Sequence, residues 1–182
     1  MKKEVAEANA TKLIYNGPCV LVTCQRNGRP NVFTVSWNTP VSIVPPIVAI
    51  SCVKSNYSWE IIRGTKEFTI NVPEMDIVDA VFGCGKVSGR EVDKFSRFGF
   101  GLESGKKVSV PSIKECPGQL ECKVIAEPQF GDFSLFVAEV VSAYAEEEKF
   151  DTKWILEKAK IINHLGDEVF YSLGIKQSAK LI

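Results

Sequence analysis

Three short stretches rich in hydroxyl, amide and glycine residues flank apolar runs in this sequence, at positions 34–38, 51–58 and 83–95. Hydroxyl groups, a helix N-terminus and a lysine or arginine side chain are the groups that hold an anionic phosphate. A planar ring system needs an apolar slot with backbone donors along its edge, which strand ends supply. Taken singly, each stretch is also typical of a strand end, a helix N-cap or a solvated turn. Together they predict a site for a flat, phosphorylated ligand.

Side chains for acid–base or nucleophilic catalysis are scarce. The single histidine, His164, is near the C-terminus and distant in sequence from any cluster of cysteines or serines. The nucleophile motif Gly-x-Ser-x-Gly, the Walker phosphate loop and a Gly-x-Gly-x-x-Gly motif after a strand do not occur. We interpret His164 as a structural residue, and the sequence disfavours hydrolysis and phosphoryl transfer. A ligand that carries its own chemistry agrees with this composition.

Six cysteines, at positions 19, 24, 52, 84, 116 and 122, raise the question of a metal site. They form no Cys-x-x-Cys pair, and Cys19 and Cys24 would face opposite sides of one strand. Cys116 and Cys122 would lie about 20 Å apart on an extended strand, too far to share an ion. We therefore expect buried, apolar thiols and no metal ligands.

Length and charge point to an ordinary globular protein. The 182 residues are enough for one domain, and 22 basic residues balance 22 acidic ones. A net charge of zero provides no general attraction for nucleic acid or for an anionic membrane. The N-terminus is polar, and no segment approaches the roughly 20 apolar residues of a membrane span. These features predict a single cytoplasmic domain over residues 1–182.

Alternating and apolar runs predict six strands, at 18–24, 31–37, 47–53, 67–72, 119–126 and 133–144. Asn27 and Gly28 suit the tight turn of a hairpin between the first two strands. A helix is expected over 56–63, with Ser55 as its N-cap and Gly64 as its end. A second helix is expected over 74–82, a glycine-rich loop over 83–89 and a charged turn or helix over 90–98. Residues 151–163 suit either a helix or an irregular edge. The pattern predicts a mainly β protein built as a closed antiparallel barrel.

Motifs in a fixed order carry a resemblance to the flavin reductase-like family, which includes the flavoredoxins and an archaeal ferric reductase. The resemblance covers about residues 10–174. It implies an FMN-binding split barrel, that is, a six-stranded antiparallel Greek-key barrel with a few short helices. It also implies a homodimer with the flavin near the subunit interface. The motifs are at 18–23, 30–37, 45–51, 67–73, 84–95, 120–122 and 135–140.

The resemblance also assigns residues to the FMN, although it assigns no catalytic residue. Four groups are implied: flavin contacts along one strand end, residues flanking the ring, residues near the ribityl chain and phosphate, and a basic loop. In that order they are Thr34, Val35, Ser36 and Trp37; Ser51, Cys52 and Val53; Ser55, Asn56 and Tyr57; and Ser88, Gly89 and Lys94, with Lys94 carrying the charge for the phosphate.

Two positions depart from or qualify this pattern. Many relatives have Gly-Asp-His before the long strand, whereas this chain has Phe133 after Gly131 and Asp132. If that histidine positions a nicotinamide, direct oxidation of NAD(P)H by this chain is in question, and a phenylalanine could instead shield or stack against a ring. The thiol of Cys52 would lie beside the flavin, where a structural role is favoured over a redox role.

The expected function is an FMN-binding oxidoreductase. Electrons would pass from NAD(P)H or a redox partner protein, through FMN, to a free flavin, a ferric chelate or a protein acceptor. One alternative is a carrier module that binds flavin without turnover. Another is a barrel that binds a different small apolar ligand.

Overall fold

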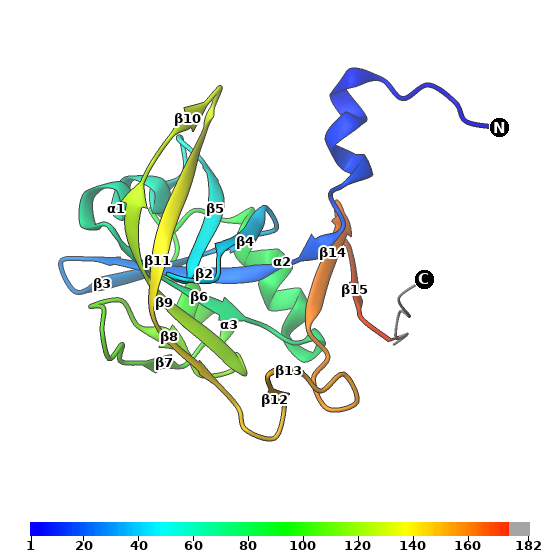
Figure 1. Ribbon diagram of the computed structural model, residues 1–182. Helices are drawn as coiled ribbons and strands as arrows, with labels where there is room; N and C mark the ends of the chain where they lie inside the picture. Colours follow the sequence, from blue (N-terminus) through cyan, green and yellow to red (C-terminus); the bar gives the residue numbers. More distant parts are fainter. Residues whose placement is uncertain (175–182) are drawn as a thin grey trace.

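A long antiparallel sheet forms the body of the molecule in the computed structural model, which describes residues 1–174 (Figure 1). The strand order is β3-β2-β6-β9-β11-β5-β4, and β10 pairs with β11 beside this path. The strands are β2 (Val20–Arg26), β3 (Arg29–Val35), β4 (Asn38–Ser42), β5 (Ile47–Val53), β6 (Glu67–Val72), β9 (Gly118–Ala126), β10 (Gln129–Phe130) and β11 (Phe133–Ala145).

The six strands expected from the sequence are all present, as β2, β3, β5, β6, β9 and β11. The turn between β2 and β3 has positive φ angles at Asn27 (53°) and Gly28 (72°), as its Asn-Gly sequence predicts. β2 is buried from Val20 to Cys24 because both of its faces are covered. Val20 and Val22 pack in one core cluster, and Leu21 packs in the other.

The sheet curls into a barrel because β5, near one edge of the strand order, meets the end of β3, the strand at the other edge. The N–H of Ser51 in β5 donates to the carbonyl of Trp37, which follows β3, over 2.9 Å. One core cluster is shared by the barrel strands and the first helix, with Phe68 and Phe136 fully buried in it. The second cluster lies between the sheet and the later helices. The predicted mainly β, antiparallel architecture is therefore correct.

The first helix, α1 (Tyr57–Thr65), corresponds to the expected helix at 56–63, but both of its predicted ends are wrong. Asn56, and not Ser55, occupies the N-cap position. Gly64 lies inside the helix, and the left-handed C-cap residue is Lys66, with φ of 59°. The Lys66 N–H donates to the Ile62 carbonyl over 2.8 Å, so the last turn continues past the glycine before the chain reverses.

The second expected helix is longer than predicted. A 3-10 turn, η2 (Met75–Ile77), leads into α2 (Val78–Lys86), which includes positions 83–86 of the glycine-rich stretch expected to form a loop. Val81 and Cys84 are buried on the side that packs against β3. A Cβ at Gly83 would lie 2.7 Å from the ring of Phe98, so the glycine allows α3 (Lys94–Phe98) to approach α2. The glycines of this helix therefore serve close packing.

The C-terminal part forms a small separate sheet beside the barrel. Residues 151–163 contain short strands, turns and the start of β14, which agrees with the irregular edge and not with a helix. Figure 1 shows the β14–β15 hairpin next to β1, with the N-terminal 3-10 helix η1 projecting away from the barrel. The remaining elements are η1 (Glu7–Leu13), β1 (Gly17–Pro18), β7 (Leu102–Glu103), β8 (Ser112–Ile113), β12 (Phe150–Asp151), β13 (Lys153–Trp154), β14 (Ile162–Gly166) and β15 (Val169–Ser172).

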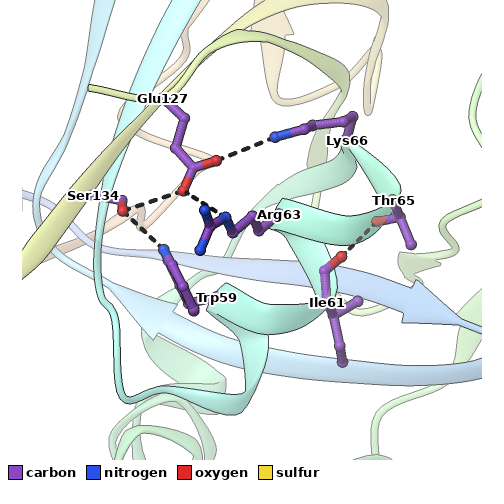
Figure 2. A network of polar contacts seen from close by, with 7 residues as sticks. All are labelled: Trp59, Ile61, Arg63, Thr65, Lys66, Glu127 and Ser134. Atoms are coloured by element: carbon purple, nitrogen blue, oxygen red, sulfur yellow. Dashed lines mark hydrogen bonds and ion pairs between the residues drawn. The ribbon is translucent and has the colours of Figure 1, made fainter. Parts of the chain in front are cut away.

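A polar network fixes α1 against the start of β11 (Figure 2). The Trp59 indole N–H donates to Ser134 Oγ over 2.8 Å, and Ser134 donates to Glu127 over 3.3 Å. Glu127 also accepts from Lys66 at 3.1 Å and lies 3.9 Å from Arg63. Because Ser134 follows Phe133 directly, this network holds the N-terminal half of α1 and the beginning of β11 in a fixed relation.

Three further observations concern the part of the chain that the structure describes. In residues 1–174, no helix is both long and apolar enough to cross a membrane. The same residues contain no group of three or more His, Cys, Asp or Glu side chains arranged to hold a metal ion. All six cysteines are free thiols and buried, which confirms the prediction that these side chains are buried.

Candidate functional site

A groove with a volume of about 620 Å³ opens where β3 and β5 end. Its walls come from four parts of the chain: these strand ends, the start of β11, the end of η1 with the segment after it, and the β14–β15 hairpin. The lining residues are Thr11, Lys12, Tyr15, Thr34, Val35, Ser36, Trp37, Ser51, Val53, Phe133, Leu165, Gly166, Asp167 and Val169. A second hollow of about 420 Å³ shares Tyr15, Ser36, Trp37 and Ser51 with this groove.

Six residues predicted to contact the ligand meet in this groove. They are Thr34, Val35, Ser36, Trp37, Ser51 and Val53. They come together because the Ser51 N–H bonds to the Trp37 carbonyl, which joins two segments that are separate in sequence. The Thr34 hydroxyl donates to the Val81 carbonyl of α2 over 2.6 Å, so this side chain also fixes the helix behind the groove.

Cys52 belongs to the same strand end, but its side chain points the other way. Residues 51 and 53 line the groove, and alternation along β5 turns the residue between them into the barrel core. Burial raises the pKa of the Cys52 thiol to about 12, so it stays protonated at neutral pH. The thiol is therefore a core side chain in this structure, as the structural interpretation expected.

The other predicted residues gather around the first turn of α1 and the loop after α2. Ser55, Asn56 and Tyr57 are at the helix start, and Ser88 and Gly89 are in the loop. Arg90 joins the two segments: its guanidinium lies 5.0 Å from the centre of the Tyr57 ring and forms an ion pair with Glu60. A Cβ at Gly89 would lie only 1.9 Å from Asn31 Oδ1, so the loop backbone passes directly over β3.

Lys94 lies in this second region, and its ammonium already has a partner. The residue is 5% exposed, and Nζ donates to the Cys84 carbonyl over 2.8 Å. Burial lowers the pKa of Lys94, because desolvation disfavours its charged form. Lys94 lines a smaller cavity of about 360 Å³, together with Arg29, Asn31 and Gly89, and not the large groove. In this arrangement it ties the start of α3 to the last part of α2.

Aromatic rings form one wall of the large groove. Trp37 and Phe133 are stacked, with 5.2 Å between ring centroids and an interplanar angle of 23°. Tyr15 meets Trp37 edge-on at 6.1 Å. Phe133, which stands where many relatives are expected to carry a histidine, therefore stacks on another ring of the protein.

The sequence interpretation missed the involvement of His164. Its Nδ1 lies 2.8 Å from the Tyr15 hydroxyl and 3.1 Å from Ser36 Oγ, and both of these residues line the groove. Pairing of β1 with β14 brings them together, since Gly17 is opposite His164. Tyr15 and His164 are 149 positions apart, and no local sequence signal links them.

An antiparallel barrel whose strand ends open into a groove with hydroxyl groups and aromatic rings is typical of β-barrel proteins that bind small ligands. This chain belongs to the flavin reductase-like family: the family model described as "Flavin reductase like domain" matches residues 13–161. The structural neighbours are FMN-binding split barrels, which confirms the predicted fold class.

Three relatives illustrate the similarity. An uncharacterized protein of Archaeoglobus fulgidus is 37% identical over 113 residues, which cover 62% of this chain and 64% of that protein. A flavin reductase of Pseudomonas putida is 26% identical over 133 residues, covering 72% of this chain and 74% of that protein. The crystal structure of a flavoredoxin from Methanosarcina acetivorans is 29% identical, covers 100% of this chain and 96% of its own, and superposes with a TM-score of 0.89.

Proposed function

We propose that this chain binds FMN with the isoalloxazine ring in the 620 Å³ groove and transfers electrons through it. The observation that carries the proposal is the meeting of Thr34–Trp37 with Ser51 and Val53 at one groove, where hydroxyl and backbone groups lie beside aromatic rings. The volume lies within the range of about 300–1,000 Å³ that small-molecule and cofactor sites occupy. Family membership supports the identity of the ligand.

The donor set suits each part of FMN. Ser36 and Ser51 supply hydroxyls for the polar edge of the ring, and Trp37 and Phe133 supply apolar surface. The first turn of α1 with Ser88 and Arg90 supplies donors and a positive charge for the phosphate. We assign the phosphate charge to Arg90, because Lys94 Nζ is buried against a carbonyl, whereas the Arg90 guanidinium, although paired with Glu60, is exposed beside Tyr57 at the start of α1.

When bound, FMN supplies hydride and single-electron transfer, and the protein binds and orients it. The proposed donors are NAD(P)H or a partner redox protein, and the proposed acceptors are free flavin, a ferric chelate or a protein. Relatives named flavin reductase and flavoredoxin support catalytic turnover over the alternative of a carrier that only stores flavin.

The test is a visible absorbance spectrum of the purified protein, followed by titration of the flavin-free form with FMN. We expect saturable binding with one FMN per chain. A preparation that is colourless and takes up no FMN would refute the proposal and favour another apolar ligand. Anaerobic addition of NADPH or NADH, with and without ferric chelate, then separates an enzyme from a carrier: bound flavin that no donor reduces indicates a carrier.

We also propose that the chain forms a homodimer. Three apolar side chains on β4 and the turn after it are exposed: Val41 at 55%, Ile43 at 89% and Val44 at 88%. β4 begins at Asn38, directly after the groove residue Trp37, so a partner on this face would lie next to the flavin. Light scattering after size-exclusion chromatography tests the dimer. A wild-type monomer would refute it, and Ile43→Asp should convert the dimer to a monomer.

A further inference from the structure

A partly buried hydrogen-bonded group lies behind one wall of the groove. It consists of Tyr15, His164 and Ser36, with the two hydroxyl oxygens 2.8 Å and 3.1 Å from Nδ1 of the histidine. Tyr15 and Ser36 line the groove, whereas His164 is only 8% exposed. The imidazole is held in place by rings on two sides, Tyr15 at 5.2 Å and Phe170 at 4.7 Å between centroids.

The hydrogen-bond partners of His164 assign its tautomer. Nε2 lies 3.0 Å from the carbonyl oxygen of Asp167, and a carbonyl only accepts, so the hydrogen of the neutral ring is on Nε2. Nδ1 of that ring then offers a single lone pair. Two hydroxyls approach this lone pair, and only one of them can donate to it with good geometry.

Tyr15 makes the shorter contact, at 2.8 Å against 3.1 Å for Ser36. With the lone pair taken by the Tyr15 proton, the Ser36 proton has to point elsewhere. Its alternatives are the Cys19 sulfur, 3.5 Å from Oγ, and the groove itself. The sulfur is a weak acceptor, so an acceptor atom on a bound ligand is the stronger partner.

We propose that Tyr15 and His164 are positioning residues that keep the Ser36 hydroxyl free to donate a hydrogen bond to the ligand in the groove. For the ligand this inference rests on the proposed function, in which Ser36 donates to the polar edge of the FMN ring. A donor at this edge stabilises negative charge that develops on reduction. The hydrogen bond from Ser36 therefore strengthens the binding of reduced FMN more than that of oxidised FMN, provided that Tyr15 donates its proton to Nδ1 of His164.

Tyr15→Phe is the informative variant, because it removes one oxygen atom and leaves Nδ1 of His164 free to take the Ser36 proton. We expect FMN affinity to fall about fivefold to tenfold, the size of one hydrogen bond. We also expect the midpoint potential of bound FMN to become more negative, by about 30 mV for each tenfold change in the ratio of affinities for reduced and oxidised FMN. Ser36→Ala should have the same two effects.

A double-mutant cycle separates positioning from direct contact. If Tyr15 acts through Ser36, adding Tyr15→Phe to Ser36→Ala should change neither affinity nor potential further. His164→Asn keeps an acceptor near the position of Nδ1 and should retain most of the wild-type potential, whereas His164→Leu should resemble Ser36→Ala. Tyr171→Phe, in strand β15 opposite Asn163, is the matched control and should behave as wild type.

Additive effects of Tyr15→Phe and Ser36→Ala would overturn the inference, as would a Tyr15→Phe variant that matches Tyr171→Phe in both measurements. The flavin-free protein provides an independent test. His164 is the only histidine, so its ring nitrogens give unambiguous NMR signals. We expect the proton on Nε2 and a shift of the Nδ1 signal in Tyr15→Phe. A neutral ring with its proton on Nδ1 would refute the inference whether or not FMN binds, whereas absence of FMN binding by the wild type would refute the proposed function alone.

Discussion

Replacement of Phe133 by histidine tests whether this position limits the use of nicotinamide. Phe133 lines the groove, is opposite Val53 in the β5–β11 pair and stacks on Trp37 at 5.2 Å. A histidine at this position would keep a ring against Trp37 and add a hydrogen-bond donor that faces the groove. We therefore expect Phe133→His to increase the rate at which NADPH reduces bound FMN.

The structure sets the size of two effects of Phe133→His, the change in stability and the change in the rate of FMN reduction. A stacked aromatic pair contributes about 0.5–1.5 kcal/mol beyond its buried area. Trp37 is 43% exposed and the imidazole retains part of the stack, so we expect the free energy of unfolding to fall by about 1 kcal/mol or less, or roughly 2–4 °C in Tm for a chain of this size. One added hydrogen bond of about 0.5–1.5 kcal/mol corresponds to roughly a twofold to tenfold rise in kcat/KM for NADPH.

The assay is anaerobic reduction of bound FMN by NADPH, followed by its absorbance, together with thermal unfolding of the same samples. Phe133→Leu removes the ring without adding a donor. Phe130→His makes the same exchange on β10, at a side chain that is 66% exposed and outside the groove lining. The reasoning fails if wild type already reacts as fast as Phe133→His, or if Phe133→His is no faster than both controls.

Three other predictions follow from single contacts. Arg90→Ala should weaken FMN binding about tenfold or more, because a charge-assisted hydrogen bond contributes about 1.5–3 kcal/mol. Arg63→Ala, in α1 and paired with Glu127, should leave the affinity unchanged in the same titration. Gly89→Ala should lower the free energy of unfolding by roughly 1–3 kcal/mol, because its Cβ would lie 1.9 Å from Asn31 Oδ1; Gly64→Ala, with nothing within 4 Å of its Cβ, should be neutral or stabilising in the same urea titration. Burial raises the pKa of Cys19 and Cys84 from 9.0 to about 11, and that of Cys24, Cys52 and Cys122 to about 12. Since the unfolded chain loses these protons first, the free energy of unfolding should fall as pH rises from about 9 towards 11, by about 1.4 kcal/mol per thiol and pH unit; a flat profile in urea titrations under reducing conditions would contradict this.

Much of the barrel could be predicted from the sequence. Each strand carries its own signal in alternation and β-branched residues, and Asn27-Gly28 encodes the first hairpin turn. The groove residues at 34–37 and at 51 and 53 are two short segments at strand ends, so finding the strands also located them. Cys52 was expected to flank the ring with Ser51 and Val53, but alternation along β5 turns its side chain into the barrel core instead.

Several predicted details failed or changed because they depend on neighbours. Gly64 is a good helix end by composition, but the last turn of α1 continues to Lys66, whose carbonyl accepts from Val124 in β9. Glycines at 83 and 85 suggested a loop, yet they lie in a helix pressed against Phe98 and Thr34. Lys94 was predicted to face a phosphate, and the structure places its ammonium against the Cys84 carbonyl.

By itself, the sequence determined the strands, the first hairpin and the two segments that supply most of the groove, because these depend on residues a few positions apart. Only the tertiary structure decided which side chains share a hydrogen bond. Tyr15 and His164 are 149 positions apart and Ser36 and His164 are 128 apart, and the pairing of β1 with β14 brings them within 3.1 Å. A hydrogen bond requires its two atoms to be about 3 Å apart, and for residues this distant in sequence that separation is fixed by the packing of the whole chain.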